Sequence, residues 1–257
     1  MNIKSKTLMA VVLSCGVSTA VAEESVLLMS YTLDSLKGKF GQAQETTVQS
    51  FTVGATLVGD RYRASAFIPI VSVDGPGSLA GGTVTSANAR QPGRVNGLGD
   101  VVGTLSLDFV GSPNKKGTSI GLTGIAKLPT GDKQDGLGTG EGDFGLQLDL
   151  GYRFNKDLAL DATVGRMNYG DSPQYPLLDG NYQSVGMTVG LTNEFTVNVN
   201  ATKRQRIIRG GDERRESSIT GIYSLSPKTA LRVTGLVGDG DSSPDSLVSV
   251  GVVVQSD

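Results

Sequence analysis

Residues 143–154 alternate without interruption between apolar side chains and polar or small ones. One face carries Phe144, Leu146, Leu148, Leu150, Tyr152 and Phe154, and the other carries Asp143, Gly145, Gln147, Asp149, Gly151 and Arg153. Because successive side chains of a β-strand point to opposite faces, this segment is predicted to form one strand with an apolar and a polar face. The apolar face needs a partner, which is either a protein core or lipid.

The alternation recurs along the chain, in about twelve segments of mostly nine to twelve residues. A tilted membrane strand needs roughly 9–11 residues, which is close to these lengths. The chain has 36 glycines and no tryptophan, which favours a barrel bounded by lipid over a soluble sandwich with a packed core. The segments lie near residues 25–33, 47–58, 61–72, 100–110, 118–128, 143–154, 158–169, 182–191, 195–206, 216–225, 229–237 and 246–255.

The connections between these segments alternate between long and short. The long ones cover residues 34–46, 73–99, 129–142, 170–181, 207–215 and 238–245, and the short ones lie near residues 59–60, 111–117, 155–157, 192–194 and 226–228. Outer-membrane barrels have short periplasmic turns and long outer loops. The sequence therefore predicts an all-β fold, a transmembrane up-and-down antiparallel β-barrel of about 12 strands, with its long loops outside.

Aromatic residues flank both kinds of connection. Tyr62, Phe109, Phe154, Phe195 and Tyr223 lie beside short turns, and Phe144, Tyr169 and Tyr182 lie beside long loops. Two interfacial belts of rings would produce this distribution. The alternative is that aromatic rings flank turns in any β-protein.

The N-terminus resembles a secretory signal peptide. Lys4 and Lys6 precede an apolar run over residues 8–17, and Ala20-Val21-Ala22 supplies a small-x-small cleavage site. We therefore expect residues 1–22 to be removed and residues 23–257 to form one barrel domain. Two alternatives are a retained membrane anchor, for which the apolar run is short, and cleavage before a lipidated Cys15.

Composition excludes several classes of function. Removing residues 1–22 takes two of the 23 basic residues and none of the 25 acidic ones, so the mature net charge is −4. This balance argues against nucleic acid as a partner. The only cysteine lies in the signal peptide, and the absence of histidine excludes Ser-His-Asp and Cys-His catalytic sites. We expect no enzyme, no catalytic residues, no cofactor and no metal site.

Two short motifs resemble ligand-binding sites, one for phosphate and one for calcium. Residues 136–142 read G-L-G-T-G-E-G, but a phosphate loop needs a helix after it, and here an alternating strand follows. Asp239, Asp241 and Asp245 offer oxygen ligands for calcium, but they lack the twelve-residue loop with its closing glutamate. We interpret both segments as outer loops.

Charged residues on the polar faces of the strands are predicted to line the lumen. An Arg or Lys facing lipid at the bilayer midplane would cost about 2–4 kcal/mol. The candidates are Arg63, Asp108, Lys127, Asp149, Arg153, Asp161 and Arg232. Asp108, Arg153 and Asp161 would form a salt-bridged layer near the periplasmic end if they share one depth. Such a layer would either narrow a pore or brace a closed barrel.

A second set of basic residues lies where the ninth predicted strand leaves the membrane. Its members at the outer rim are Lys203, Arg204, Arg206 and Arg209, with Arg214 and Arg215 at the end of the loop, just before the tenth strand returns. Guanidinium groups bind phosphates in a bidentate manner, so lipopolysaccharide and outer-membrane lipid are the predicted partners. The alternative is a solvated hairpin neutralised by Asp212, Glu213 and Glu216.

Three motifs resemble one known family. They are Gly97-Leu98-Gly99-Asp100, then K-L-P-T-G-D over residues 127–132, then G-L-G-T-G over residues 136–140. The segment 97–154 is similar to outer-membrane proteins linked to meta-pathway phenol degradation. This resemblance implies a monomeric barrel that passes small hydrophobic or aromatic compounds and has no catalytic residues.

The end of the chain departs from the expected pattern. Barrels of this type usually end in an aromatic residue that is recognised by the barrel assembly machinery. This chain ends Val253-Val254-Gln255-Ser256-Asp257. We expect the barrel assembly machinery to be a partner of this chain, although the C-terminal signal that it would recognise lacks the usual aromatic residue.

The functional prediction is a passive channel or facilitator for small molecules in the outer membrane, gated by the long loops, above all residues 73–99. One alternative is a structural or surface-interaction barrel with a blocked lumen. A third is a soluble periplasmic β-sandwich that binds a ligand.

Overall fold

The computed structural model describes residues 25–81, 83–86 and 93–256, and in these residues the regular structure is β-strand throughout. The predicted signal peptide and the Cys15 alternative lie outside the described residues. The strands are β1 (Val26–Gly38), β2 (Thr46–Val58), β3 (Tyr62–Asp74), β4 (Ser78–Ala80), β5 (Thr83–Thr85), β6 (Arg94–Leu98), β7 (Val101–Val110), β8 (Gly117–Leu128), β9 (Asp143–Arg153), β10 (Leu158–Asn168), β11 (Gly180–Gly190), β12 (Phe195–Arg204), β13 (Arg214–Ser226), β14 (Thr229–Asp239) and β15 (Ser246–Gln255).

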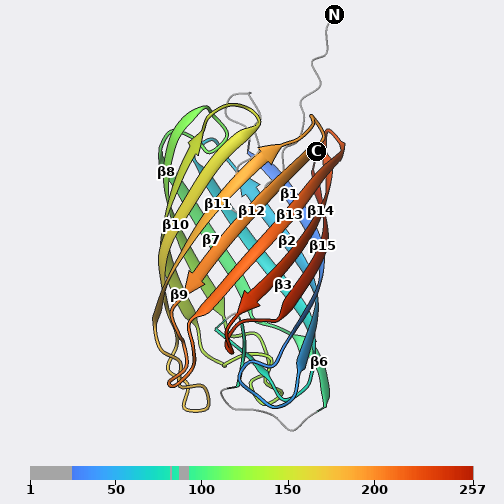
Figure 1. The fold of residues 1–257 in the computed structure, drawn as a ribbon, viewed down its shortest axis with the longest axis vertical. Helices are drawn as coiled ribbons and strands as arrows, with labels where there is room; N and C mark the ends of the chain where they lie inside the picture. Colours follow the sequence, from blue (N-terminus) through green and yellow to red (C-terminus); the bar gives the residue numbers. More distant parts are fainter. Residues whose placement is uncertain (1–24, 82, 87–92, 257) are drawn as a thin grey trace, which may run out of the picture.

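The long strands form a closed antiparallel barrel in which neighbours in sequence are neighbours in space (Figure 1). The ring closes where β1 pairs with β15 on one side and with β2 on the other. Twelve positions around the ring are filled, because β6 and β7 share one of them. This confirms the prediction of an up-and-down barrel of about 12 strands, and it excludes the sandwich.

One position in the ring is occupied by two strands in succession. β6 pairs with residues Ile70–Asp74 of β3, and β7 pairs with residues Tyr62–Phe67 of the same strand. The break falls at Gly99 and Asp100, where the Gly99 amide donates to the Pro69 carbonyl at 2.9 Å. A separate hairpin, β4–β5, follows β3. The prediction of one plain loop over residues 73–99 missed these three strands, because segments of three to five residues are too short to show a period.

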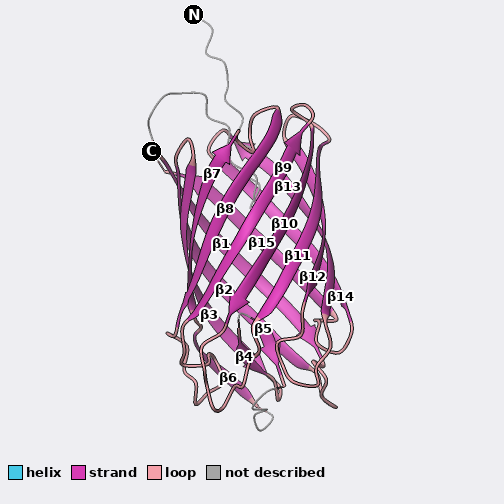
Figure 2. Ribbon diagram, turned by 90° about the vertical axis from the view of Figure 1, so that its left-hand side faces the viewer, coloured by secondary structure: helices cyan, strands magenta, loops and turns pink. Residues whose placement is uncertain are grey.

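The connections sort to the two ends of the barrel. Figure 2 shows short turns at the upper end and the long loops, with β4, β5 and β6, at the lower end. β1 begins and β15 ends at the short-turn end (Figure 1). This is the predicted arrangement of short and long connections.

The outer face of the barrel is apolar. Side chains on this face include Phe144 and Val185, with exposed fractions of 65% and 61%. A soluble protein rarely exposes so continuous an apolar surface, whereas a lipid bilayer covers it at no cost. Within the described residues there is no helix long and apolar enough to cross a membrane.

A band of aromatic rings follows the outer face near the short turns. Phe109, Phe154 and Tyr223 are exposed there, and the Tyr152 and Phe154 rings meet edge to face at 4.7 Å. Tyr182 was assigned to the opposite belt, and this is wrong. Its hydroxyl donates to Gln147 inside the barrel at 2.6 Å, because the strand register places Tyr182 opposite Gly165 on the inner face.

Two apolar clusters occupy the inside of the barrel. The mouth cluster at the long-loop end consists of Phe40, Val48, Val71, Val73, Val84 and Leu137, with Leu36, Leu79 and Val95 packed against it. The exit cluster at the short-turn end consists of Leu28, Ile222, Ala230 and Val253, with Val26 and Val58. The polar part of the lumen lies between them.

Candidate functional site: the barrel lumen

The inner wall at mid-height is lined by hydroxyl and amide side chains. They come from strands on both sides of the ring, and some are half-buried, whereas others on the inner wall, such as Thr32, Thr123 and Thr163, are buried. Several are joined across strands, as in Thr56 to Ser65 at 3.0 Å and Thr220 to Thr234 at 2.9 Å. The lining residues include Ser30, Ser50, Thr52, Thr56, Ser65, Asn200, Thr202, Ser218, Thr220 and Thr234.

Asp149 is the centre of a hydrogen-bonded network on the β9 wall. It accepts from Thr123 at 2.7 Å, from Thr163 at 2.8 Å and from Gln147 at 2.8 Å. Tyr182 extends the network by donating to Gln147, and the Arg204 guanidinium lies 5.3 Å from the Tyr182 ring centroid. Among the described residues no cation forms an ion pair with Asp149, so its charge is held by neutral donors.

The charged residues near the short-turn end do not form the predicted layer. Asp108 pairs with Arg63 at 3.0 Å, and Arg153 instead donates to the Pro113 carbonyl at 2.9 Å. Asp161 lies over Gly186, where a Cβ would collide with its carboxylate, and its Oδ1 has no hydrogen-bond partner within the described residues. The three predicted members line one small cavity together with Arg63, but within the described residues no ion pair joins them to one another.

Arg232 stands on another part of the wall. It lies on β14, with three strands between it and β10 in one direction and seven in the other. Its guanidinium donates to Thr32 at 3.3 Å and forms no ion pair in the described part of the chain. Arg232 is thus separate from the cavity that Asp149 and Asp161 share with Arg63 and Arg153.

Lys127 belongs to a buried cluster at the long-loop rim, which we call the rim clamp. Its ammonium lies 2.7 Å from Asp100, 3.1 Å from Asp143 and 3.1 Å from the Thr139 hydroxyl. Asp100 also accepts from the Gly131 amide at 2.9 Å. The exposed fractions of the Lys127 and Asp143 side chains are 4% and 1%. Lys127 was predicted to line the lumen, but its charge is buried in this cluster.

The rim clamp unites the three motifs behind the family resemblance. Asp100 comes from G-L-G-D, Lys127 begins K-L-P-T-G-D, and Thr139 lies in G-L-G-T-G. Sequence reasoning missed Asp100 and Asp143 as partners of Lys127. The sequence did indicate that Asp143 lies on the polar, inward face of its strand. Its contact with Lys127 could not be predicted, because it depends on how the strands are arranged in the fold.

The β4–β5 hairpin, which we call the strap, crosses the mouth. On one side the Gly77 amide donates to Thr46 at 2.9 Å, and the Leu79 amide donates to the Gly136 carbonyl at 2.8 Å. On the other side Arg214 of β13 donates to Thr83 and pairs with Glu216. The strap therefore links the β2 wall to the β13 wall and carries Leu79 and Val84 into the mouth cluster.

An opening of about 250 Å³ remains beside the strap. It lies between the strap and the β12–β13 and β14–β15 loops. Its lining combines the polar residues Thr83, Arg209, Asp212, Arg214 and Asp241 with Phe40 and Val84 of the mouth cluster. The described part of the mouth thus keeps a cavity of mixed polarity beside the strap.

The predicted lipopolysaccharide contacts do not share one face. Lys203 lies on the outer face opposite Gln183 and pairs with Glu213 at 2.8 Å. The pKa of the Glu213 carboxyl lies below its ordinary value, because Lys203 donates to it and Arg215 lies nearby. Arg204 lies on the inner face over Tyr182, which removes it from the lipid side. Arg206 and Arg209 are exposed in the β12–β13 loop.

Closed ring, apolar exterior and polar lumen define a β-barrel of the outer-membrane type. No protein-family model and no curated protein sequence matches the chain. Solved structures do match. A NanC porin aligns with a TM-score of 0.58 at 10% identity, over 88% of this chain and 98% of that one.

Two further structures show the same likeness. The KdgM porin in complex with disordered oligogalacturonate gives a TM-score of 0.57 at 8% identity, over 90% of this chain and 99% of that one. The β domain of the Bordetella autotransporter BrkA gives 0.55 at 14% identity, over 91% of this chain and all of that one (100%). At these identities the likeness establishes the fold.

Proposed function

We propose that the protein is a passive channel of the outer membrane for small molecules. The observation that carries the proposal is a closed barrel whose inner wall at mid-height is lined by hydroxyl and amide side chains, some of them half-buried. A wall of Ser, Thr and Asn side chains exchanges hydrogen bonds with passing water and solutes without binding any one of them tightly. The cavity beside the strap is the proposed entrance to this lumen.

The permeant class is the finer part of the proposal. The resemblance of residues 97–154 to the phenol-degradation family implies small hydrophobic or aromatic compounds. The apolar mouth and exit clusters support that class, because they place apolar side chains at both ends of a polar passage. Two of the similar structures are porins by name, and no enzymatic activity is proposed for this chain.

The decisive experiment is single-channel conductance of the mature protein in planar bilayers, with a matched pair of variants. Thr220 points into the lumen, and its neighbour Ile219 points out and is 56% exposed. Thr220→Trp is expected to reduce conductance because it fills the lumen at mid-height, and Ile219→Trp is expected to leave it unchanged. Liposome uptake of phenol and of a pentose then distinguishes the permeant class.

A barrel with a blocked lumen is the second candidate. The mouth cluster favours it, because Phe40, Val84 and Leu137 are nearly fully buried and close part of the mouth. Absence of conductance in the intact protein, with a channel appearing only when the strap is removed, would establish this candidate and refute the open channel.

A further inference from the structure

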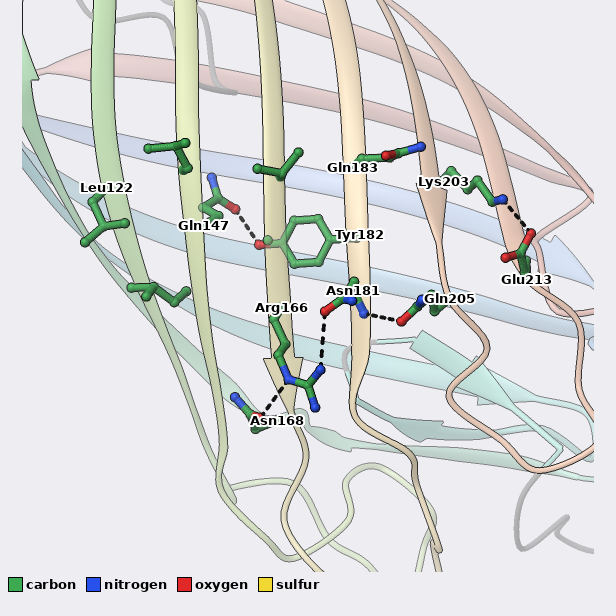
Figure 3. A pocket seen from close by; sticks show the side chains of 14 residues that line it. Leu122, Gln147, Arg166, Asn168, Asn181, Tyr182, Gln183, Lys203, Gln205 and Glu213 are labelled. Atoms are coloured by element: carbon green, nitrogen blue, oxygen red, sulfur yellow. Dashed lines mark hydrogen bonds and ion pairs between the residues drawn. The ribbon is translucent and has the colours of Figure 1, made fainter.

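A groove of about 790 Å³ lies on the wall formed by β8 to β12, toward the long-loop end (Figure 3). Its apolar floor consists of Leu122, Leu146, Leu148 and Val164. The register places Leu122, Leu148 and Val164 opposite one another on neighbouring strands, all on the outer face. The groove therefore lies mainly on the lipid side of the barrel, and three residues of the inner-face parity, Gln147, Gly165 and Tyr182, also contribute to its lining.

The rim of the groove is polar and carries two exposed cations. Figure 3 shows Arg166 beside Asn168 and Asn181, and Lys203 beside Glu213. Arg166 lies 3.3 Å from Asp179, and its side chain keeps an exposed fraction of 54%. The Lys203 side chain keeps 44%. Surface ion pairs of this kind contribute little stability, so a phosphate can displace the carboxylate from either cation.

Four carboxamides complete the rim. They are Asn168, Asn181, Gln183 and Gln205. Each carboxamide offers two donors and an acceptor, which suits the hydroxyl groups of a sugar. Part of this capacity is used within the protein, since the Gln205 Oε1 accepts from the Asn181 backbone N–H at 2.8 Å. A simple phospholipid would use the cations but not this row of amides.

The change from apolar floor to polar rim marks a depth in the membrane. On β10 the outer face changes from Val164 to Arg166, and on β12 it changes from Ala201 to Lys203. Charged side chains that face lipid cost least near the interface, so this boundary is the level at which hydrocarbon gives way to headgroups. By the placement of the long loops, the headgroups belong to the outer leaflet.

We propose that this groove binds lipopolysaccharide through its phosphorylated disaccharide. An acyl chain lies on the leucine floor, a phosphate bridges Arg166 and Lys203, and sugar hydroxyls contact the carboxamide rim. The site goes beyond the channel function and does not depend on it. It also differs from the set predicted from sequence, because Arg204 faces inward and Arg166 takes its place.

Native mass spectrometry of the mature barrel in detergent tests the site. The probes are rough-type lipopolysaccharide, the same glycolipid after removal of its phosphates, and phosphatidylglycerol. The double variant Arg166→Gln with Lys203→Gln is expected to bind lipopolysaccharide about tenfold or more weakly, which corresponds to about 1.4 kcal/mol. Dephosphorylated glycolipid is expected to bind the intact protein more weakly as well.

A matched control removes two exposed cations from the short-turn end, Arg61→Gln with Lys116→Gln. Its affinity for lipopolysaccharide is expected to equal that of the intact protein. The proposal is overturned if both double variants lose affinity equally, or if neither does. It is also overturned if phosphatidylglycerol binds as tightly as lipopolysaccharide, which would make the groove a general lipid contact.

Discussion

Lys127 places one buried positive charge between two carboxylates, and this arrangement has a clear energetic consequence. Removing one partner from a buried ion pair leaves the remaining charge without compensation. In the rim clamp it would leave Asp100 and Asp143 facing each other with only Thr139 and backbone donors nearby. The clamp is therefore a site where one substitution is expected to change stability strongly.

Lys127→Met is expected to lower the free energy of unfolding by about 3–5 kcal/mol, the usual cost of breaking a buried pair. Urea unfolding in detergent, followed by gel mobility of the folded form, measures this change. Lys133→Met in the adjacent loop is the control, because Lys133 is exposed and forms no ion pair within the described residues. Equal stability of the two variants would contradict the role of the clamp.

The separation of lumen charges predicts opposite effects on ion selectivity. Asp161 and Arg232 lie on different sides of the lumen, and neither has an ion-pair partner in the described chain. Asp161→Asn is expected to shift selectivity toward anions, and Arg232→Gln toward cations, because each removes one lumen charge that is not tied in an ion pair. Reversal potentials in a salt gradient measure both, and a shift of the same sign in the two variants would contradict the assignment.

At the scale of the element, side-chain parity explains what could be predicted from sequence. Alternation located the twelve long strands of the ring, and the same pattern, read further, also places two residues that were assigned to the wrong face. Continuing the outer face of β11 from Val185 to Gln183 places Tyr182 inside, and continuing β12 from Val199 to Lys203 places Arg204 inside. The strap could not be found in this way, because strands of three residues have no period and are held by contacts with distant walls.

Replacing the strap, residues 78–85, with a short Gly-Ser linker is expected to raise conductance. The replacement removes Leu79 and Val84 from the mouth cluster and frees Arg214 from Thr83. Single-channel recording measures the change. The control replaces residues 241–243 in the β14–β15 loop with the same linker, and equal conductance in both variants would exclude the strap as the constriction.

The last strand predicts how the chain end affects assembly. β15 is fully paired with β14 and β1, yet it ends without an aromatic residue. Val254 faces outward and Val253 faces inward, with 4% exposure. Val254→Phe is expected to increase the amount of folded protein in the outer membrane, whereas Val253→Phe is expected to decrease it by overpacking the exit cluster. Fractionation followed by gel mobility measures both amounts.

For the molecule as a whole, closure of the ring determines its behaviour in detergent. Every long strand has a hydrogen-bonded neighbour on each side, so no long edge is left open in the described barrel. The mature protein is expected in the membrane fraction, with different gel mobility before and after boiling. Deleting residues 246–257 removes the closing strand and is expected to abolish the difference in mobility. A soluble protein with one mobility would contradict the membrane barrel.

The rim clamp holds a loop without touching the mid-height lumen. Lys127, Asp100 and Thr139 come from three separate motifs of the sequence and fasten the loop at the rim. The residues that hold the mouth and the residues that line the passage are therefore different. Either set can change in evolution while the other is kept.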